Sequence, residues 1–145
     1  MSTDIGSKSI EDLEGAQWPA PQPRTPPTFV KCYQLRKKPL SKLSAADLRT
    51  LIGQDIGLHY LVPKALDILG RNPLIETEHF PGDLLVVALR AAPEFFCQRT
   101  DLRSKLEKIF ALLPIALDTL DHLDHDTTAE ALEEATAEFR RGKQV

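Results

Sequence analysis

Residues 44–70, SAADLRTLIGQDIGLHYLVPKALDILG, decide the fold, because they combine helical apolar spacing with glycines and prolines that mark corners. Ser44 followed by Asp47 is a capping-box pattern, which marks the start of a helix. The apolar residues after it recur at the spacing of one helical face: Leu48, Leu51, Ile52 and Ile56. We expect Gly57 to end this helix in the left-handed conformation and Pro63 to begin the next helix.

Similar signals predict short helices on both sides of this stretch. The predicted helix starts, in chain order, are Ser9, Pro27, Ser44, Pro63, Asp83, Thr100 or Asp101, and Thr127. The one that starts at Thr127 has a second capping-box pattern, completed by Glu130. Pro114 is expected to break or kink the helix before it, with the apolar stripe continuing through Leu117, Leu120 and Leu123.

No stretch of the chain shows convincing β alternation. The predicted fold class is therefore all-α, a single compact domain of several short helices with Gly/Pro corners. The stretch WPAPQPRTPP carries five prolines, which favour extended backbone over helix. We therefore expect residues 1–27 to form an extended, Pro-rich N-terminal arm and residues 28–145 to form the helical domain.

Length and composition fit one globular domain. The chain has 145 residues, of which 42% are hydrophobic and 27% charged. Cys32 and Cys97 lack the spacing of a zinc site and suggest reduced thiols. The N-terminus does not resemble a signal peptide, and the longest apolar run, Leu84 to Leu89, is too short to span a bilayer. These features predict a cytoplasmic protein without a membrane partner.

The small net charge of −3 hides two segments of opposite charge. Residues 21–50 contain seven Lys and Arg against one Asp, whereas residues 118–138 contain eight Asp and Glu and no Lys or Arg. One interpretation of the acidic segment is a docking surface for a basic partner. The other is a solvated helix face, paired in part with the protein's own basic segment.

Catalytic and metal-binding patterns are weak. There is no GxSxG, P-loop or HExxH motif, so no enzymatic activity and no cofactor or small-molecule ligand are expected. Asp118, Asp121, His122 and His125 follow the spacing of one helical face, which could hold a divalent metal or form a pH-sensitive contact. Since no second element completes a coordination shell, we predict no metal site.

A longer pattern carries a family resemblance. The stretch RKKPLSKLSAADLRTLIGQDIGLHYLVPKALDILGRNPL, from Arg36, resembles the signature of contact-dependent growth inhibition (CDI) immunity proteins. FPGDLL, which includes Asp83, and the arm segment EDLEGAQWPAP also resemble parts of that family's pattern. The resemblance covers roughly residues 9–107, and the acidic segment lies beyond it.

The resemblance implies an antitoxin that binds the C-terminal domain of a cognate, contact-delivered toxin, commonly a nuclease, without catalysis. An acidic partner can mimic the charge of a nuclease's substrate. The residues expected to meet the toxin are Asp118, Asp121, His122, Asp124, Glu130, Glu133 and Glu134. A second set from the family pattern is expected to be structural: Gln54, Asp55, Gly57, His59, Tyr60, Pro63 and Asp83. The alternative is a small helical nucleic-acid-associated or regulatory protein that uses the basic segment 24–49.

Overall fold

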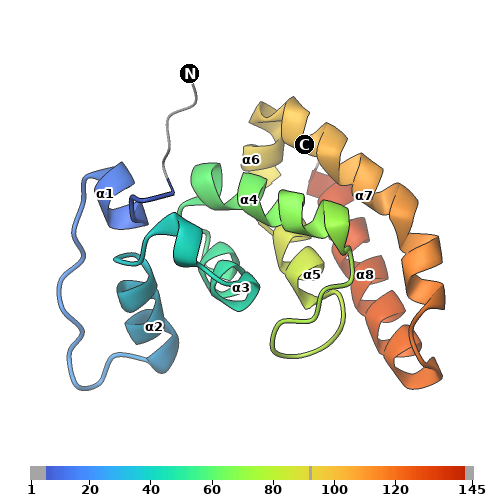
Figure 1. Ribbon diagram of the computed structural model, residues 1–145, viewed down its shortest axis with the longest axis horizontal. Coiled ribbons are helices and arrows are strands. Elements are labelled where there is room, and N and C mark those ends of the chain that lie inside the picture. The colour runs from blue at the N-terminus through green and yellow to red at the C-terminus, as the bar shows by residue number, and fades with distance from the viewer. Residues whose placement is uncertain (1–5, 92, 143–145) are drawn as a thin grey trace.

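The computed structural model describes residues 6–91 and 93–142, and helices are its main element (Figure 1). Its elements are α1 (Ile10–Glu14), α2 (Pro27–Leu35), the 3-10 turn η1 (Leu40–Lys42), α3 (Ala45–Gly53), α4 (Leu58–Arg71), α5 (Asp83–Leu89), α6 (Pro93–Gln98), α7 (Thr100–Asp118) and α8 (His122–Gly142). No strand is formed within these residues, although two isolated bridges occur. The all-α prediction is confirmed.

The helices pack around one aliphatic core. α3 lies against α5, α5 lies against α8, and α4 lies across α3 and along α7 (Figure 1). Leucines from successive helices are fully buried at the centre, including Leu51, Leu61, Leu84 and Leu106. Because few aromatic side chains are available, this packing of branched aliphatic groups supplies most of the hydrophobic stabilisation.

Capping boxes form at the starts of α3 and α1, and the one at Ser44 is the one that the sequence predicted. The Ser44 hydroxyl accepts from the Asp47 N–H at 3.1 Å, and the Asp47 carboxylate accepts from the Ser44 N–H at 3.0 Å. Ser9 and Asp12 make the same exchange at the start of α1, and Gly15 ends that helix in the left-handed conformation. Local sequence therefore determines these two helix starts.

The corner between α3 and α4 differs from the prediction. α3 ends at Gly53, and Asp55 adopts a positive φ of 55°. Gly57 is left-handed as expected, with φ 63°, but it is the residue before α4 and does not end α3. Because α4 already begins at Leu58, Pro63 lies inside it and does not start it. The missing proline N–H leaves the His59 carbonyl without its usual helical donor.

The helix start at Asp83 is confirmed, but the capping role predicted for its side chain and the helix start predicted at Thr127 are wrong. α5 begins after Gly82, and the Asp83 side chain does not cap it. α8 begins at His122, so Thr127 lies within the helix; the carboxylate of Asp121 accepts from the Asp124 N–H at 2.9 Å and takes the capping role. Two competing Asp and Thr signals lie close together here, and the earlier one starts the helix.

Pro114 does not end its helix, because α7 continues to Asp118. The start of α7 also lacks the predicted cap: Arg99 precedes it and no side chain makes a capping hydrogen bond. The apolar stripe does not continue through Leu123, which is 80% exposed. Residues 119–121 lie between α7 and α8, so residues at helical spacing after Leu117 no longer share one face toward the core.

Candidate functional site

The acidic residues expected to meet a partner lie at the end of α7, in the connection to α8 and along α8 (Figure 1). Most of them are exposed, and we call the set the acidic edge: Asp118, Asp121, His122, Asp124, Glu130, Glu133 and Glu134. They are not one helical stripe, because Asp118 ends α7 and His122 begins α8. The edge is thus a bent surface.

Some of these carboxylates have structural contacts. Asp121 caps α8, and Glu134 lies 3.9 Å from Arg90, which is also 3.0 Å from Glu138. His122 and His125 both approach Asp126, at 4.0 and 3.6 Å. In the part of the chain that the structure describes, no ion pair or side-chain hydrogen bond involves Glu130 or Glu133. These two side chains are exposed charge without a structural task.

No group of three or more His, Cys, Asp or Glu residues within the described chain is placed to hold a metal ion. The predicted spacing of Asp118, Asp121, His122 and His125 assumed one continuous helix, which the break after Asp118 removes.

The family-pattern residues around the α3–α4 corner line two separate depressions. Asp55, Gly57, His59 and Tyr60 line a shallow one together with Glu14 of α1. His59 meets Phe95 edge-on there, with ring centroids 5.2 Å apart. The two aromatic rings fix the orientation of the corner against α6.

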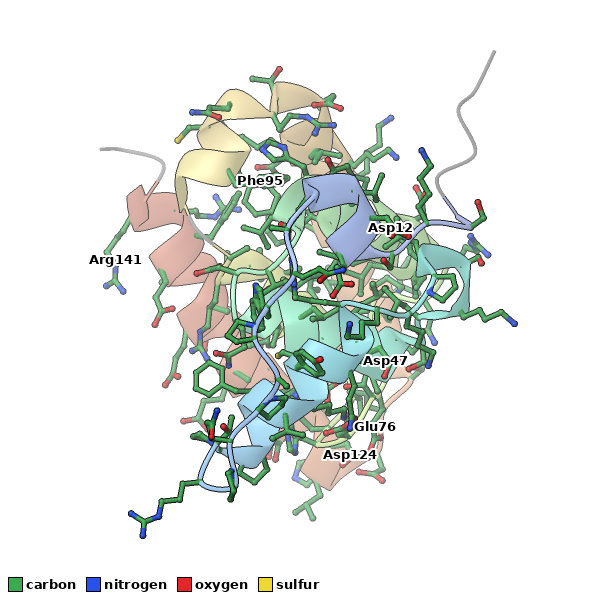
Figure 2. All side chains as sticks on the ribbon, turned by 90° about the vertical axis from the view of Figure 1, so that its left-hand side faces the viewer. Asp12, Asp47, Glu76, Phe95, Asp124 and Arg141 are labelled. Carbon is green, nitrogen blue, oxygen red and sulfur yellow. The ribbon has the colours of Figure 1, made fainter. Side chains whose placement is uncertain are left out.

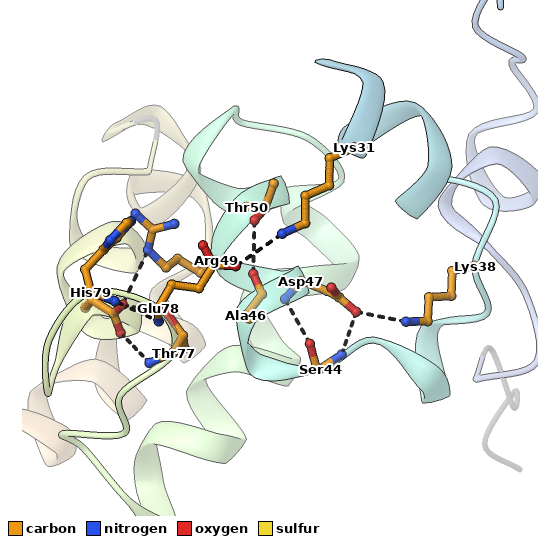
Figure 3. Close-up of polar contacts among 11 residues, drawn as sticks. Lys31, Lys38, Ser44, Ala46, Asp47, Arg49, Thr50, Thr77, Glu78 and His79 are labelled. Atoms are coloured by element: carbon orange, nitrogen blue, oxygen red, sulfur yellow. Dashed lines mark hydrogen bonds and ion pairs between the residues drawn. The ribbon is translucent and has the colours of Figure 1, made fainter. Parts of the chain in front are cut away.

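Gln54 points to a different, more polar groove. This groove lies between α2, α3 and the loop before α5, and its lining includes Lys31, Arg49 and His79. The groove is closed on one side by the Lys31–Glu78 ion pair at 3.2 Å (Figure 3). Gln54 therefore lines a different depression from Asp55, Gly57, His59 and Tyr60, and these five of the seven expected residues do not form a single site.

Asp83 organises the loop before α5. Its carboxylate accepts from the Thr77 N–H, the Thr77 hydroxyl and the N–H groups of Glu78 and His79, at 2.7–3.0 Å (Figure 3). Burial by itself would raise the pKa of Asp83, but the hydrogen bonds from Thr77, Glu78 and His79 outweigh it and lower the pKa. The side chain is 2% exposed, with Arg49 3.6 Å away. This contact set is structural.

Arg36 has a structural role that sequence reasoning did not identify. Its guanidinium is 1% exposed, donates to Glu14 at 2.6 Å and to the Ala16 carbonyl at 3.0 Å, and lies 4.5 Å from the centre of the Trp18 ring. A buried arginine needs such partners, because an unpaired buried charge is costly. Trp18 of the arm is thus held against the domain by a stacked, paired cation.

The basic segment is largely paired within the protein. Five of its seven cations form ion pairs: Lys31–Glu78, Arg36–Glu14, Lys37–Glu11, Lys38–Asp47 and Arg49–Asp83. Burial opposes ionisation of Asp47, but the Ser44 N–H and Lys38 more than compensate, so its pKa is lowered. Figure 2 shows Asp12 and Asp47 on this side of the molecule, among the basic side chains. Four of the acidic partners lie more than 20 residues away in the sequence, so composition alone overstated the free positive charge.

A match to a family model identifies the family of this chain. A family model described as CDI immunity proteins matches residues 12–106, from α1 into the first half of α7. The chain belongs to this family. No curated protein and no solved structure matches it. Membership gives the chain an immunity, or antitoxin, role, and it implies a cognate toxin as partner.

Arg36, Asp47, Gly57 and Asp83 of this immunity protein all lie inside the matched range, and each has a structural contact or conformation described above. The acidic edge lies outside it. None of the helices in the described chain is long and apolar enough to cross a membrane.

Proposed function

We propose that this immunity protein neutralises the C-terminal domain of a contact-delivered toxin by binding it one-to-one in the cytoplasm, through the acidic edge of α7 and α8. It does so without catalysis. The partner surface carries excess Lys and Arg, since complementary charge accelerates encounter and rejects wrong partners. A toxin domain that degrades nucleic acid has such a surface around its substrate groove.

The observation that carries the proposal is the unequal use of charge. The basic segment is neutralised mostly by acids elsewhere in the scaffold, whereas Glu130 and Glu133 are exposed and meet no cation in the described chain. The acidic edge also lies beyond residue 106, where the family match ends. A surface that must suit one toxin is expected outside the part that all family members share.

The first experiment is co-purification with the toxin domain encoded by the neighbouring gene, followed by binding kinetics at low and high salt. The charge reversals Glu130→Lys and Glu133→Lys are preferred to reversals at Asp121, because Asp121 caps α8. Together they should slow association roughly tenfold at low salt, and the difference should shrink at high salt, because exposed charges more than about 10 Å apart are largely screened at 0.1 M.

The matched control is Glu107→Lys, an exposed acid on the first half of α7 and still next to the family scaffold. It changes the net charge as much as either single reversal and should leave association nearly unchanged. If the wild-type chain does not bind the toxin domain, the proposed function is wrong. If it binds but the double reversal associates at the wild-type rate at low salt, the acidic edge is not the toxin-facing surface.

A further inference from the structure

Large hydrophobic side chains are exposed at one corner of the molecule. Leu112, Ile115 and Leu123 are 42%, 74% and 80% exposed, and Phe29 on α2 is 48% exposed. The first three lie on the second half of α7 and the first turn of α8, on either side of the α7–α8 connection (Figure 1). Leu112 lines a depression with Lys105 and Lys108, so we call only Ile115 and Leu123 the apolar corner. It concentrates aliphatic surface that the core does not use.

The corner is exposed because Ile115 and Leu123 lie on sides of α7 and α8 that do not pack against the core. Leu106 and Ile109 of α7 are buried against it, and Leu132 of α8 is buried as well. Leu113, Ala116 and Leu117 of α7 still pack against the core, whereas Ile115 between them is 74% exposed and Leu123 of α8 is 80% exposed. Folding alone therefore does not account for Ile115 and Leu123, which could be polar without loss of core packing.

Aspartates flank Ile115 and Leu123 in the sequence. Asp118, Asp121, Asp124 and Asp126 fall in or beside the α7–α8 connection, and no Lys or Arg occurs between Lys108 and Arg140. An apolar centre within a charged, solvated rim is the usual anatomy of a protein interface. We propose that the apolar corner inserts into an apolar pocket of the toxin domain that is rimmed by Lys and Arg. This inference rests on the proposed function and names the anchors of that interface.

The charge around the corner selects this occupant over a second copy of the chain. A two-fold dimer at this face would bring each aspartate rim against its own copy. Like charges placed opposite one another in an interface are unfavourable, and they act against self-association. A partner with a basic rim satisfies both the aspartates and the exposed leucine and isoleucine side chains.

The exposed carboxylates and the apolar corner then have separate kinetic roles. Exposed carboxylates act at a distance and change the association rate, whereas apolar anchors act only once they are desolvated and change the dissociation rate. Substitutions in the corner should therefore alter binding in a way that salt does not modify. This separates the inference from the charge-reversal test of the proposed function.

The experiment measures binding of the full chain to the toxin domain of the neighbouring gene, using Ile115→Ser, Leu123→Ser and the double variant. Each side chain is mostly exposed, so thermal melting should remain near wild type. The double variant should bind at least about tenfold more weakly, through faster dissociation, with the same factor at low and high salt. The control is Phe29→Ser, an exposed hydrophobic residue on α2, which should bind as wild type.

Three results would overturn the inference. The double variant could dissociate at the wild-type rate, or Phe29→Ser could weaken binding equally. Sedimentation could also show a wild-type dimer that the double variant converts to monomer, which would assign the corner to self-association. In each case wild-type binding to the toxin domain would still support the proposed function, so the two failures are distinguishable.

Discussion

Replacing Gly57 with alanine tests the contact between the N-terminal arm and the α3–α4 corner. Gly57 has φ 63°, and a Cβ atom placed there would lie 2.6 Å from Cδ1 and 3.3 Å from Cγ1 of Ile10. Ile10 is fully buried, so its side chain has little room to move. The left-handed backbone costs an alanine about 1–2 kcal/mol, and overpacking of a closed site costs a further ~1–3 kcal/mol.

Gly15→Ala is the matched control for the backbone term. Gly15 has φ 66°, but nothing lies within 4 Å of the Cβ position. It should lose only the conformational part, about 1–2 kcal/mol, whereas Gly57→Ala should lose ~2–5 kcal/mol from both terms. For a chain of this size each kcal/mol lowers the melting temperature by about 2–4 °C, so calorimetry or urea unfolding resolves the two variants.

Ile10→Val then identifies the clashing atom. Valine lacks Cδ1, and the substitution by itself should cost about 0.5–1.5 kcal/mol. In that background Gly57→Ala should cost less than it does in the wild type, which is a measurable coupling between contacting residues. Equal losses for Gly15→Ala and Gly57→Ala, or an unchanged cost of Gly57→Ala in the Ile10→Val background, would show that Ile10 does not pack against this corner.

Two further predictions concern the other structural groups. Asp83→Asn should lower the free energy of unfolding at neutral pH by about 2–3 kcal/mol, because buried donors lose a charged acceptor. The folded-state pKa of Asp83 is lowered, so its stabilisation is complete above the unfolded pKa near 4 and disappears as pH falls through the folded pKa. Urea titrations should therefore show the stabilities of wild type and variant converging in acid. Trp18→Ala should cost roughly 1–2 kcal/mol, because the Arg36 guanidinium loses its stacked ring, and it should speed trypsin cleavage after Arg24 in the arm; cleavage at the wild-type rate would contradict an anchoring role for Trp18.

The sequence predicted what depends on near neighbours. The helix start at Ser9, the capping box at Ser44 and the left-handed conformation of Gly57 depend on residues within one turn, and all three are confirmed. Helix boundaries were less predictable where two signals compete. Pro63 and Pro114 were taken as boundaries, but each helix had begun earlier and packing on the core carries it through the proline.

The candidate site was predictable only in part, for the same physical reason. Exposure of Glu130 and Glu133 follows from residue type, and both are exposed. The partners of Asp83, by contrast, are backbone N–H groups of a loop, which carry no sequence signal. The exposure of Leu123 depends on where α7 ends, and no local pattern marks that residue as surface.

Charge pairing explains how one chain of small net charge presents a strongly acidic surface. Arg36 and Lys37 form ion pairs with Glu14 and Glu11 of α1. Folding therefore pairs most cations of the basic segment with acidic side chains. Along the acidic edge the counterpart is Arg90, which serves Glu134 and Glu138. The net charge of the whole chain hides this difference in pairing. The unpaired Glu130 and Glu133 lie beyond residue 106, on the helix that also carries Leu123 of the apolar corner. Scaffold and recognition surface can then vary independently, because changing Glu130 or Ile115 disturbs no contact on which the fold depends.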